Sequence, residues 1–223
     1  MIHPRIVAAA AIGTLIWGGS ATLAPESGER AASTARASGT YAILAGADTA
    51  VIERWNRTDS ELDVTMDVIG QARLEFRAGL SADASVSTMS MRVFGPDGTE
   101  PMGEANATFT GDSVMAIQSS GAAVDTVHRD TRAGAVAYLS PSVVLTEQIV
   151  RRARAMGGES AQVPVFVVGS GGQTLDATVS FSGDSVSVQL AESELRLAIS
   201  PDGGISGGSI PGEPQVRIVR VDG

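Results

Sequence analysis

Alternation of apolar and polar residues constrains this chain more than any other feature of its sequence. Residues 61–68 and 71–80 place apolar side chains at every second position, and residues 174–181 and 186–199 repeat the pattern. A period of two turns one face of a strand toward a core and the other toward water. Turn residues such as those at 95–98 separate the runs at intervals of about 8–12 residues, which is typical of an antiparallel sandwich or barrel.

One segment has the pattern of a helix instead. Residues 141–156 carry apolar side chains at helical spacing, Ser140 is a suitable N-cap, Pro141 suits the first helical position and Gly157 provides a stop. A parallel sheet would need a crossover, usually helical, between consecutive strands. The sequence therefore predicts a mainly β fold: a curved antiparallel sheet or open barrel of consecutive hairpins, with one covering α-helix at about 141–156.

The N-terminus has the features of a secretory signal peptide. Residues 1–5 are basic, residues 6–17 contain no charge, and small residues follow as far as Ala24. We therefore expect a signal peptide over 1–24, cleaved after Ala21 or Ala24, a flexible tether over 25–38 and a single β-rich domain over 39–223. The expected location is secreted or periplasmic, with no transmembrane span after cleavage.

Composition excludes several classes of function. The 223 residues include no cysteine, no lysine and only two histidines, one of them in the expected signal peptide. Disulfides, thiolate metal sites and lysine Schiff bases are therefore impossible. The net charge of -9 argues against nucleic-acid binding, because phosphate binding requires a positive field. We expect no cofactor, no metal site and no catalytic residues.

One short motif offers an enzymatic alternative. Residues 111–114, Gly-Asp-Ser-Val, are similar to the nucleophile block of an esterase and lipase family, and Asp125 and His128 have the Asp-x-x-His spacing of that family. The resemblance implies a serine between a parallel strand and a helix, whereas alternating runs flank the motif here. The same block recurs at 183–186, and Gly-Asp is a favoured two-residue hairpin loop. We expect two hairpin tips, with a serine hydrolase using Ser113 and His128 as the alternative.

The arginines of the N-terminal half lie among acidic residues of the alternating runs. We interpret them as cross-strand ion pairs on a water-facing side of the sheet, rather than as a charged groove. The five residues are Arg54, Arg57, Arg73, Arg77 and Arg92.

Three stretches, 47–55, 139–158 and 205–211, resemble uncharacterised secreted β-rich proteins of environmental bacteria with very GC-rich genomes. More loosely, a curved antiparallel sheet with one helix is similar to envelope lipoprotein carriers. We expect a non-enzymatic protein that binds an apolar or amphipathic ligand in the sheet's concavity, or serves as an envelope accessory protein. A structural or adhesion module is a further hypothesis. A deep apolar cavity would favour a carrier, and a filled core with a flat outer patch would favour a module.

Overall fold

The computed structural model describes residues 37–121, 123–168, 172–200, 203–211 and 215–221. The expected signal peptide and most of the expected tether lie outside these residues. The described elements, in chain order, are β1 (Ala37–Ala45), β2 (Asp48–Arg57), β3 (Glu61–Val68), β4 (Ala72–Leu80), β5 (Val86–Phe94), β6 (Pro101–Thr110), β7 (Ser113–Ser120), β8 (Ala123–Asp130), β9 (Val136–Tyr138), α1 (Val143–Met156), β10 (Ser160–Val167), β11 (Gln173–Ser182), β12 (Ser185–Leu190), β13 (Ser193–Ile199), β14 (Ile205–Ile210) and β15 (Val216–Val221).

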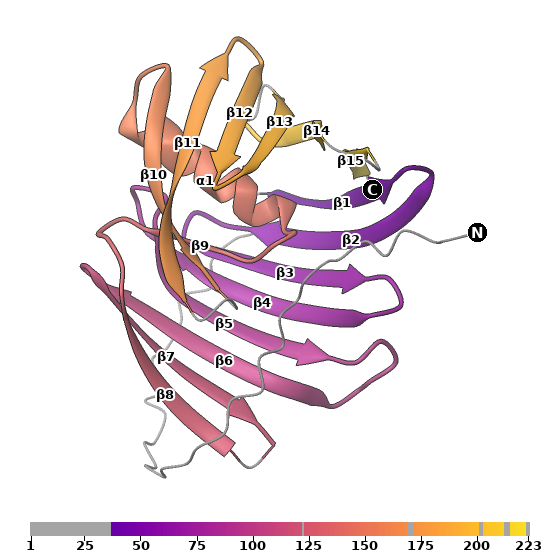
Figure 1. Cartoon of the computed structure of the whole chain (residues 1–223), viewed down its shortest axis with the longest axis vertical. Coiled ribbons are helices and arrows are strands. Elements are labelled where there is room, and N and C mark those ends of the chain that lie inside the picture. Colours follow the sequence, from indigo (N-terminus) through magenta and orange to yellow (C-terminus); the bar gives the residue numbers. More distant parts are fainter. Residues whose placement is uncertain (1–36, 122, 169–171, 201–202, 212–214, 222–223) are drawn as a thin grey trace.

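The strands of the described residues form one sheet, in the order β8-β7-β6-β5-β4-β3-β2-β1-β15-β14-β13-β12-β11-β10-β9. Neighbouring strands are antiparallel except β9 and β10, which are parallel. The sheet curls until β8 contacts β11 and β9 contacts β5, without closing into a barrel (Figure 1). The rings of Phe109 and Phe166 meet across this overlap, with centroids 5.6 Å apart. This confirms the predicted mainly β fold with a curved antiparallel sheet.

Both predicted Gly-Asp hairpin tips are confirmed. Phe109 lies opposite Val114 across the first tip, and Phe181 lies opposite Val186 across the second, as alternation requires. The two tip glycines have φ angles of 59° and 61°, a region that side chains with a Cβ rarely adopt. The repeated block is therefore turn chemistry in both places.

Helix α1 packs against the inner face of one half of the sheet, where it contacts β2, β9, β10 and β11 (Figure 1). Most of its residues are buried, including Leu145 and Ile149. The predicted helix exists but begins later than expected, because its N-cap is Ser142 rather than Ser140. The Ser142 hydroxyl accepts the backbone N–H of Leu145 at 3.1 Å, which is the geometry that N-caps require.

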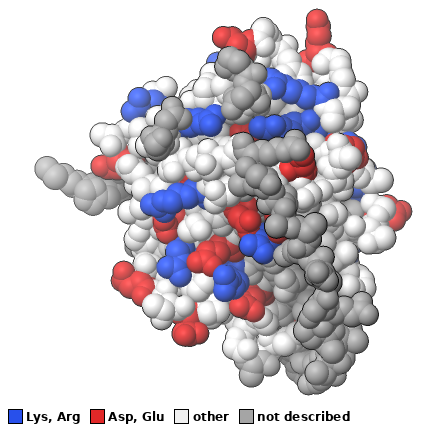
Figure 2. Space-filling view, turned by 180° about the vertical axis from the view of Figure 1, so that it is seen from behind, with Lys and Arg blue, Asp and Glu red and all other residues white. Residues whose placement is uncertain are grey.

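The outer face of β2–β5 carries ion pairs between neighbouring strands. Arg54 contacts Asp67 at 2.6 Å and Arg92 contacts Glu75 at 2.7 Å. Figure 2 shows acidic and basic side chains mixed over one side of the molecule, without a large area of one sign. The cross-strand ion-pair interpretation is therefore confirmed for these arginines and for Arg77, which contacts Asp63 of β3. Arg73 instead contacts Glu75 of its own strand, at 3.5 Å. It is wrong for Arg57, which faces the interior.

Candidate functional site

The inner face of β6–β8 is the part of the concave surface that α1 does not occupy. Apart from the contact of Phe109 with Phe166 near one end, β6 and β7 contact mainly their neighbours in the sheet, and β8 touches β11 near one end. We call this surface the open face. Cross-strand pairing places eleven inward residues on it: Ala105, Ala107, Phe109, Val114, Ala116, Gln118, Ser120, Ala123, Asp125, Val127 and Arg129. Of these, Val114 is fully buried.

Small side chains make up the middle of the open face. Ala105 pairs with Gln118, Ala107 pairs with Ala116, and all four residues are half-buried rather than buried. Met91 of β5 continues the same face beside Ala105 and is also half-buried. A sheet face of this composition normally packs against a second layer. Here apolar surface stays accessible at the centre of the strands.

Large apolar side chains are also exposed on the outer side of the same strands. Met115 and Ile117 of β7 and Val124 of β8 are each 40–44% exposed, and Met102 of β6 is 52% exposed. Singly exposed apolar residues are normal, but neighbouring ones indicate a surface that contacts something apolar. Strands β6–β8 are therefore accessible on both faces.

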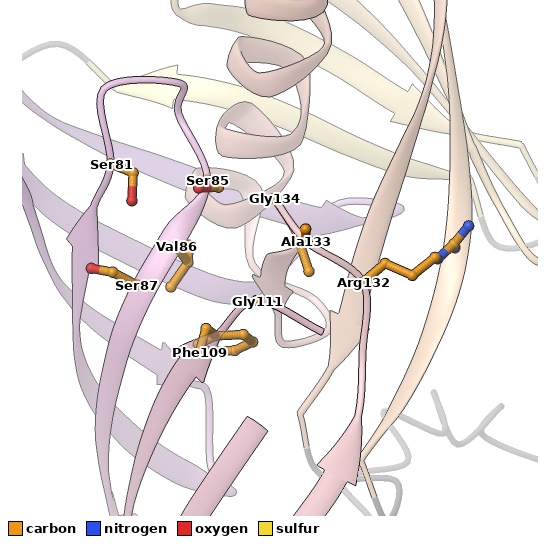
Figure 3. A pocket seen from close by; sticks show the side chains of 10 residues that line it. Ser81, Ser85, Val86, Ser87, Phe109, Gly111, Arg132, Ala133 and Gly134 are labelled. Atoms are coloured by element: carbon orange, nitrogen blue, oxygen red, sulfur yellow. The ribbon is translucent and has the colours of Figure 1, made fainter. Parts of the chain in front are cut away.

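A pocket of about 200 Å³ lies at one end of the open face. Phe109 belongs to both the open face and the pocket. Val86 and Ala135 add apolar lining to the pocket, and three serines add hydroxyls: Ser81, Ser85 and Ser87 (Figure 3). The Ser85 hydroxyl donates to the Asp83 carboxylate at 2.7 Å, and the Ser87 hydroxyl donates to the Gly79 carbonyl at 3.2 Å. The pocket is smaller than the usual 300–1,000 Å³ of a whole ligand site. It suits the end of a larger molecule.

The lining arginine of this pocket, Arg132, points away from it in Figure 3 and contacts the Asp176 carboxylate at 2.6 Å. The lining therefore combines hydroxyls with apolar groups and contains no histidine or carboxylate. It has no general acid or base, which acyl transfer would need.

The structure does not assemble the serine hydrolase alternative. Ser113 and His128 lie on the outer face of β7 and β8, since they alternate with the inward Val114 and Val127. Asp125 lies on the inner face, three residues from His128 and on the opposite side of the sheet. The Ser113 hydroxyl donates to the Thr110 carbonyl at 3.0 Å. Residues three positions apart on one strand point to opposite faces, so Asp125 cannot hydrogen-bond to His128 and orient it.

A cluster of buried polar residues joins α1 to the sheet instead. We call it the buried cluster; it consists of Tyr41, Glu53, Arg57, Ser142, Glu147 and Gln148, each 7% exposed or less. The Tyr41 hydroxyl donates to Glu147 at 2.8 Å, and the Arg57 guanidinium lies 3.5 Å from the same carboxylate. Arg57 also donates to the Gln148 side chain. Strand residues thereby hold two consecutive helix residues.

Glu53 binds the N-terminus of α1. Its carboxylate accepts the Ser142 hydroxyl and the backbone N–H groups of Val143 and Val144, the latter two at 2.8 and 3.1 Å. These N–H groups have no partner inside the helix, and the helix dipole favours an anion here. Burial nevertheless raises the pKa of Glu53 to about 7, although the three hydrogen bonds lower it.

Burial governs the other ionisable groups of the buried cluster as well. It lowers the pKa of Arg57 to about 10, so this residue remains a cation at neutral pH. Burial and the adjacent Glu147 carboxylate raise the pKa of Tyr41 above its usual range, so its hydroxyl stays a donor. Such groups resemble an active site in composition, but side chains this buried cannot reach a substrate. The buried cluster fixes α1 on the sheet.

Sequence reasoning missed both sites. It placed both Glu53 and Arg57 among the ion pairs of the water-facing side. It did not separate the open face from the rest of the sheet. Within the described residues, no group of three acidic or histidine side chains is placed to hold a metal ion. Nor does any helix there have the length and apolar character needed to span a membrane.

Comparisons with known proteins show the fold alone. No protein-family model matches the chain, and no curated protein matches it in sequence. A DUF1089 family protein from Pseudomonas aeruginosa is similar in structure, with a TM-score of 0.55 and 13% identity over 74% of this chain and 91% of that one. A β-barrel-like protein of the DUF1849 domain of unknown function, from Brucella abortus, has a TM-score of 0.48 and is 11% identical in sequence. That comparison covers 85% of this chain and 98% of the other. The first likeness is consistent with an uncharacterised β-rich family.

Proposed function

We propose that this protein is an exported, non-enzymatic binding protein of the cell envelope that holds an apolar or amphipathic ligand on the open face. The observation that carries the proposal is the accessible, alanine-rich inner surface of β6–β8, which lies beside a fully packed half of the same sheet. The packed half excludes a ligand, because α1 fills it. The available part of the concavity is therefore the open face.

The chemistry of the open face supports a ligand with apolar and polar parts. Ala105, Ala107 and Ala116 present small, half-buried apolar side chains. Phe109 of the same face also lines the pocket with the serine hydroxyls. Burying apolar area stabilises a complex by roughly 25 cal/mol per Å². An extended acyl chain lying along the strands would bury apolar area, while its polar end would contact the serine hydroxyls of the pocket.

Titration with cis-parinaric acid, a fatty acid whose fluorescence rises in apolar surroundings, tests the proposal. Neighbouring residues of β6 provide a matched pair of variants, since Ala105 faces inward and Asn106 faces outward. We expect Ala105→Arg to weaken binding at least tenfold, because it places a charge among apolar groups, and Asn106→Arg to leave binding unchanged. Far-UV circular dichroism confirms that both variants are folded.

Two results would overturn the proposal. The first is that the folded wild-type protein does not bind the probe at all. The second is a loss of binding in Asn106→Arg with normal binding in Ala105→Arg. Asn106 lies opposite Ile117, so that result would place the apolar contact on the outer side and favour an adhesion module.

A further inference from the structure

Strand β8 ends the sheet on one side. It pairs with β7 along its whole length, and no strand of the described residues pairs with its other edge (Figure 1). An edge strand presents a row of backbone donors and acceptors that can pair with another strand. Eight residues is long for an edge, because natural edges are commonly shortened or covered.

The direction of these backbone groups follows from the pairing with β7. The Thr131 N–H donates to the Asp112 carbonyl at 2.7 Å, which makes this a hydrogen-bonded pair at the end of the ladder. Hydrogen-bonded pairs recur at every second residue of an antiparallel ladder. The odd residues of β8 therefore bond to β7, and the even residues Val124, Thr126 and His128 direct their N–H and C=O groups to the free edge. The His128 carbonyl accepts the Arg129 guanidinium at 3.0 Å, a contact that pairing with a second strand would replace.

The side chains of β8 are complementary to a second copy of themselves. Asp125, Val127 and Arg129 share the inner face of the strand. When two copies pair antiparallel about Val127, Asp125 of each copy lies opposite Arg129 of the other and the two valines meet. Opposite charges at directly opposed positions stabilise strand pairing.

Other registers lose this complementarity. A shift by one residue places inner side chains opposite outer ones, which alternation does not permit. A shift by two residues places Asp125 or Arg129 opposite the apolar Val127. Charges on an edge usually prevent association because like charges meet. On β8 one acid and one base are placed symmetrically about Val127, so opposite charges meet.

We propose that the protein forms a homodimer in which β8 pairs antiparallel with β8 of a second copy, centred on Val127. Thr126 of each copy then lies opposite His128 of the other and exchanges backbone hydrogen bonds with it. The two open faces become continuous across the pair. One strand pair is a small contact compared with the 1,200–2,000 Å² of stable interfaces. We therefore expect a weak dimer with a micromolar dissociation constant, whether or not a ligand binds.

Sedimentation velocity of the purified protein over a range from about 1 to 200 μM tests the proposal. Asp125→Arg and Arg129→Asp each place like charges opposite one another twice, so we expect each to raise the dissociation constant about tenfold or more. The double variant Asp125→Arg/Arg129→Asp reverses both pairs and should restore the wild-type value. Circular dichroism confirms that each variant is folded.

A proline variant tests the backbone part of the proposal. Thr126→Pro removes an N–H that faces the free edge, so the bonds to β7 stay intact and the monomer still folds. We expect this variant to remain monomeric. The proposal is overturned if the wild-type protein is a monomer at all these concentrations. It is also overturned if folded Thr126→Pro dimerises normally, or if the double variant associates as weakly as the single ones.

Discussion

Replacing Glu53 by glutamine should remove a specific pH dependence of stability. Glu53 is fully buried and its pKa is raised to about 7 from 4.5, so folding favours its protonated form. Its contribution to stability is therefore fully present below pH 4.5 and is lost as the pH rises through 7. The difference of 2.5 pH units, at about 1.4 kcal/mol each, amounts to about 3.5 kcal/mol, most of which falls between pH 4 and pH 8. Glutamine resembles the protonated acid and does not titrate.

The assay is urea unfolding, followed by circular dichroism, of the wild-type protein and Glu53→Gln between about pH 4 and pH 8. The free energy of unfolding of the wild-type protein, minus that of the variant, should fall by about 3 kcal/mol across this range. Glu104→Gln, at an exposed position of β6, provides the control for the loss of one negative charge. A flat difference for Glu53→Gln would show instead that Glu53 titrates alike in the folded and unfolded states.

Three further predictions concern the turns, the buried cluster and the N-terminus. Gly183→Val should lower the free energy of unfolding by about 1 kcal/mol or more, because this residue has a φ of 61°; an unchanged urea midpoint would contradict this. Tyr41→Phe removes a donor from the buried Glu147 carboxylate and should cost about 1–3 kcal/mol in the same assay, whereas no change would mean that water replaces the hydroxyl. N-terminal sequencing of the protein from the producing cell should show cleavage after Ala21 or Ala24, and a retained Met1 would argue against export.

The sheet could be predicted from the sequence because alternation links pairing register to the core. Phe181 and Val186 must face the same side, so a two-residue loop between 182 and 185 is the arrangement that agrees with their spacing. The helix could be predicted from its apolar spacing and its stop at Gly157. Its first residue was less certain, because Ser140 and Ser142 are both suitable caps. Only the contacts of the folded chain select Ser142, which binds Glu53 as well as Leu145.

The buried cluster could be predicted only in part. In β2, Glu53 and Arg57 alternate in step with Val51 and Trp55, so parity alone indicates that all four face the core. What the local pattern does not contain is the partner of each charge, which lies about ninety residues away on α1. The buried environment that raises the pKa of Glu53 exists only after the helix has docked.

The open face could not be predicted from alternation, because its strands have the same pattern as the covered ones. Ala105 and Ala107 alternate with polar residues just as Val64 and Met66 do. The difference lies in how far α1 extends over the sheet, and that depends on contacts between distant segments. The alanines of β6 and β7 do not by themselves indicate an uncovered face, since small residues also occur in tightly packed sheets.

Native mass spectrometry of the protein purified from the producing cell's envelope tests ligand binding on the open face most directly. We expect a complex heavier than the bare chain, whose added mass disappears after organic extraction and is identified in the extract as an apolar or amphipathic molecule. Ala105→Arg purified in the same way should give the bare chain, while Asn106→Arg should keep the added mass. A wild-type protein that has only the mass of its bare chain would contradict ligand binding on the open face.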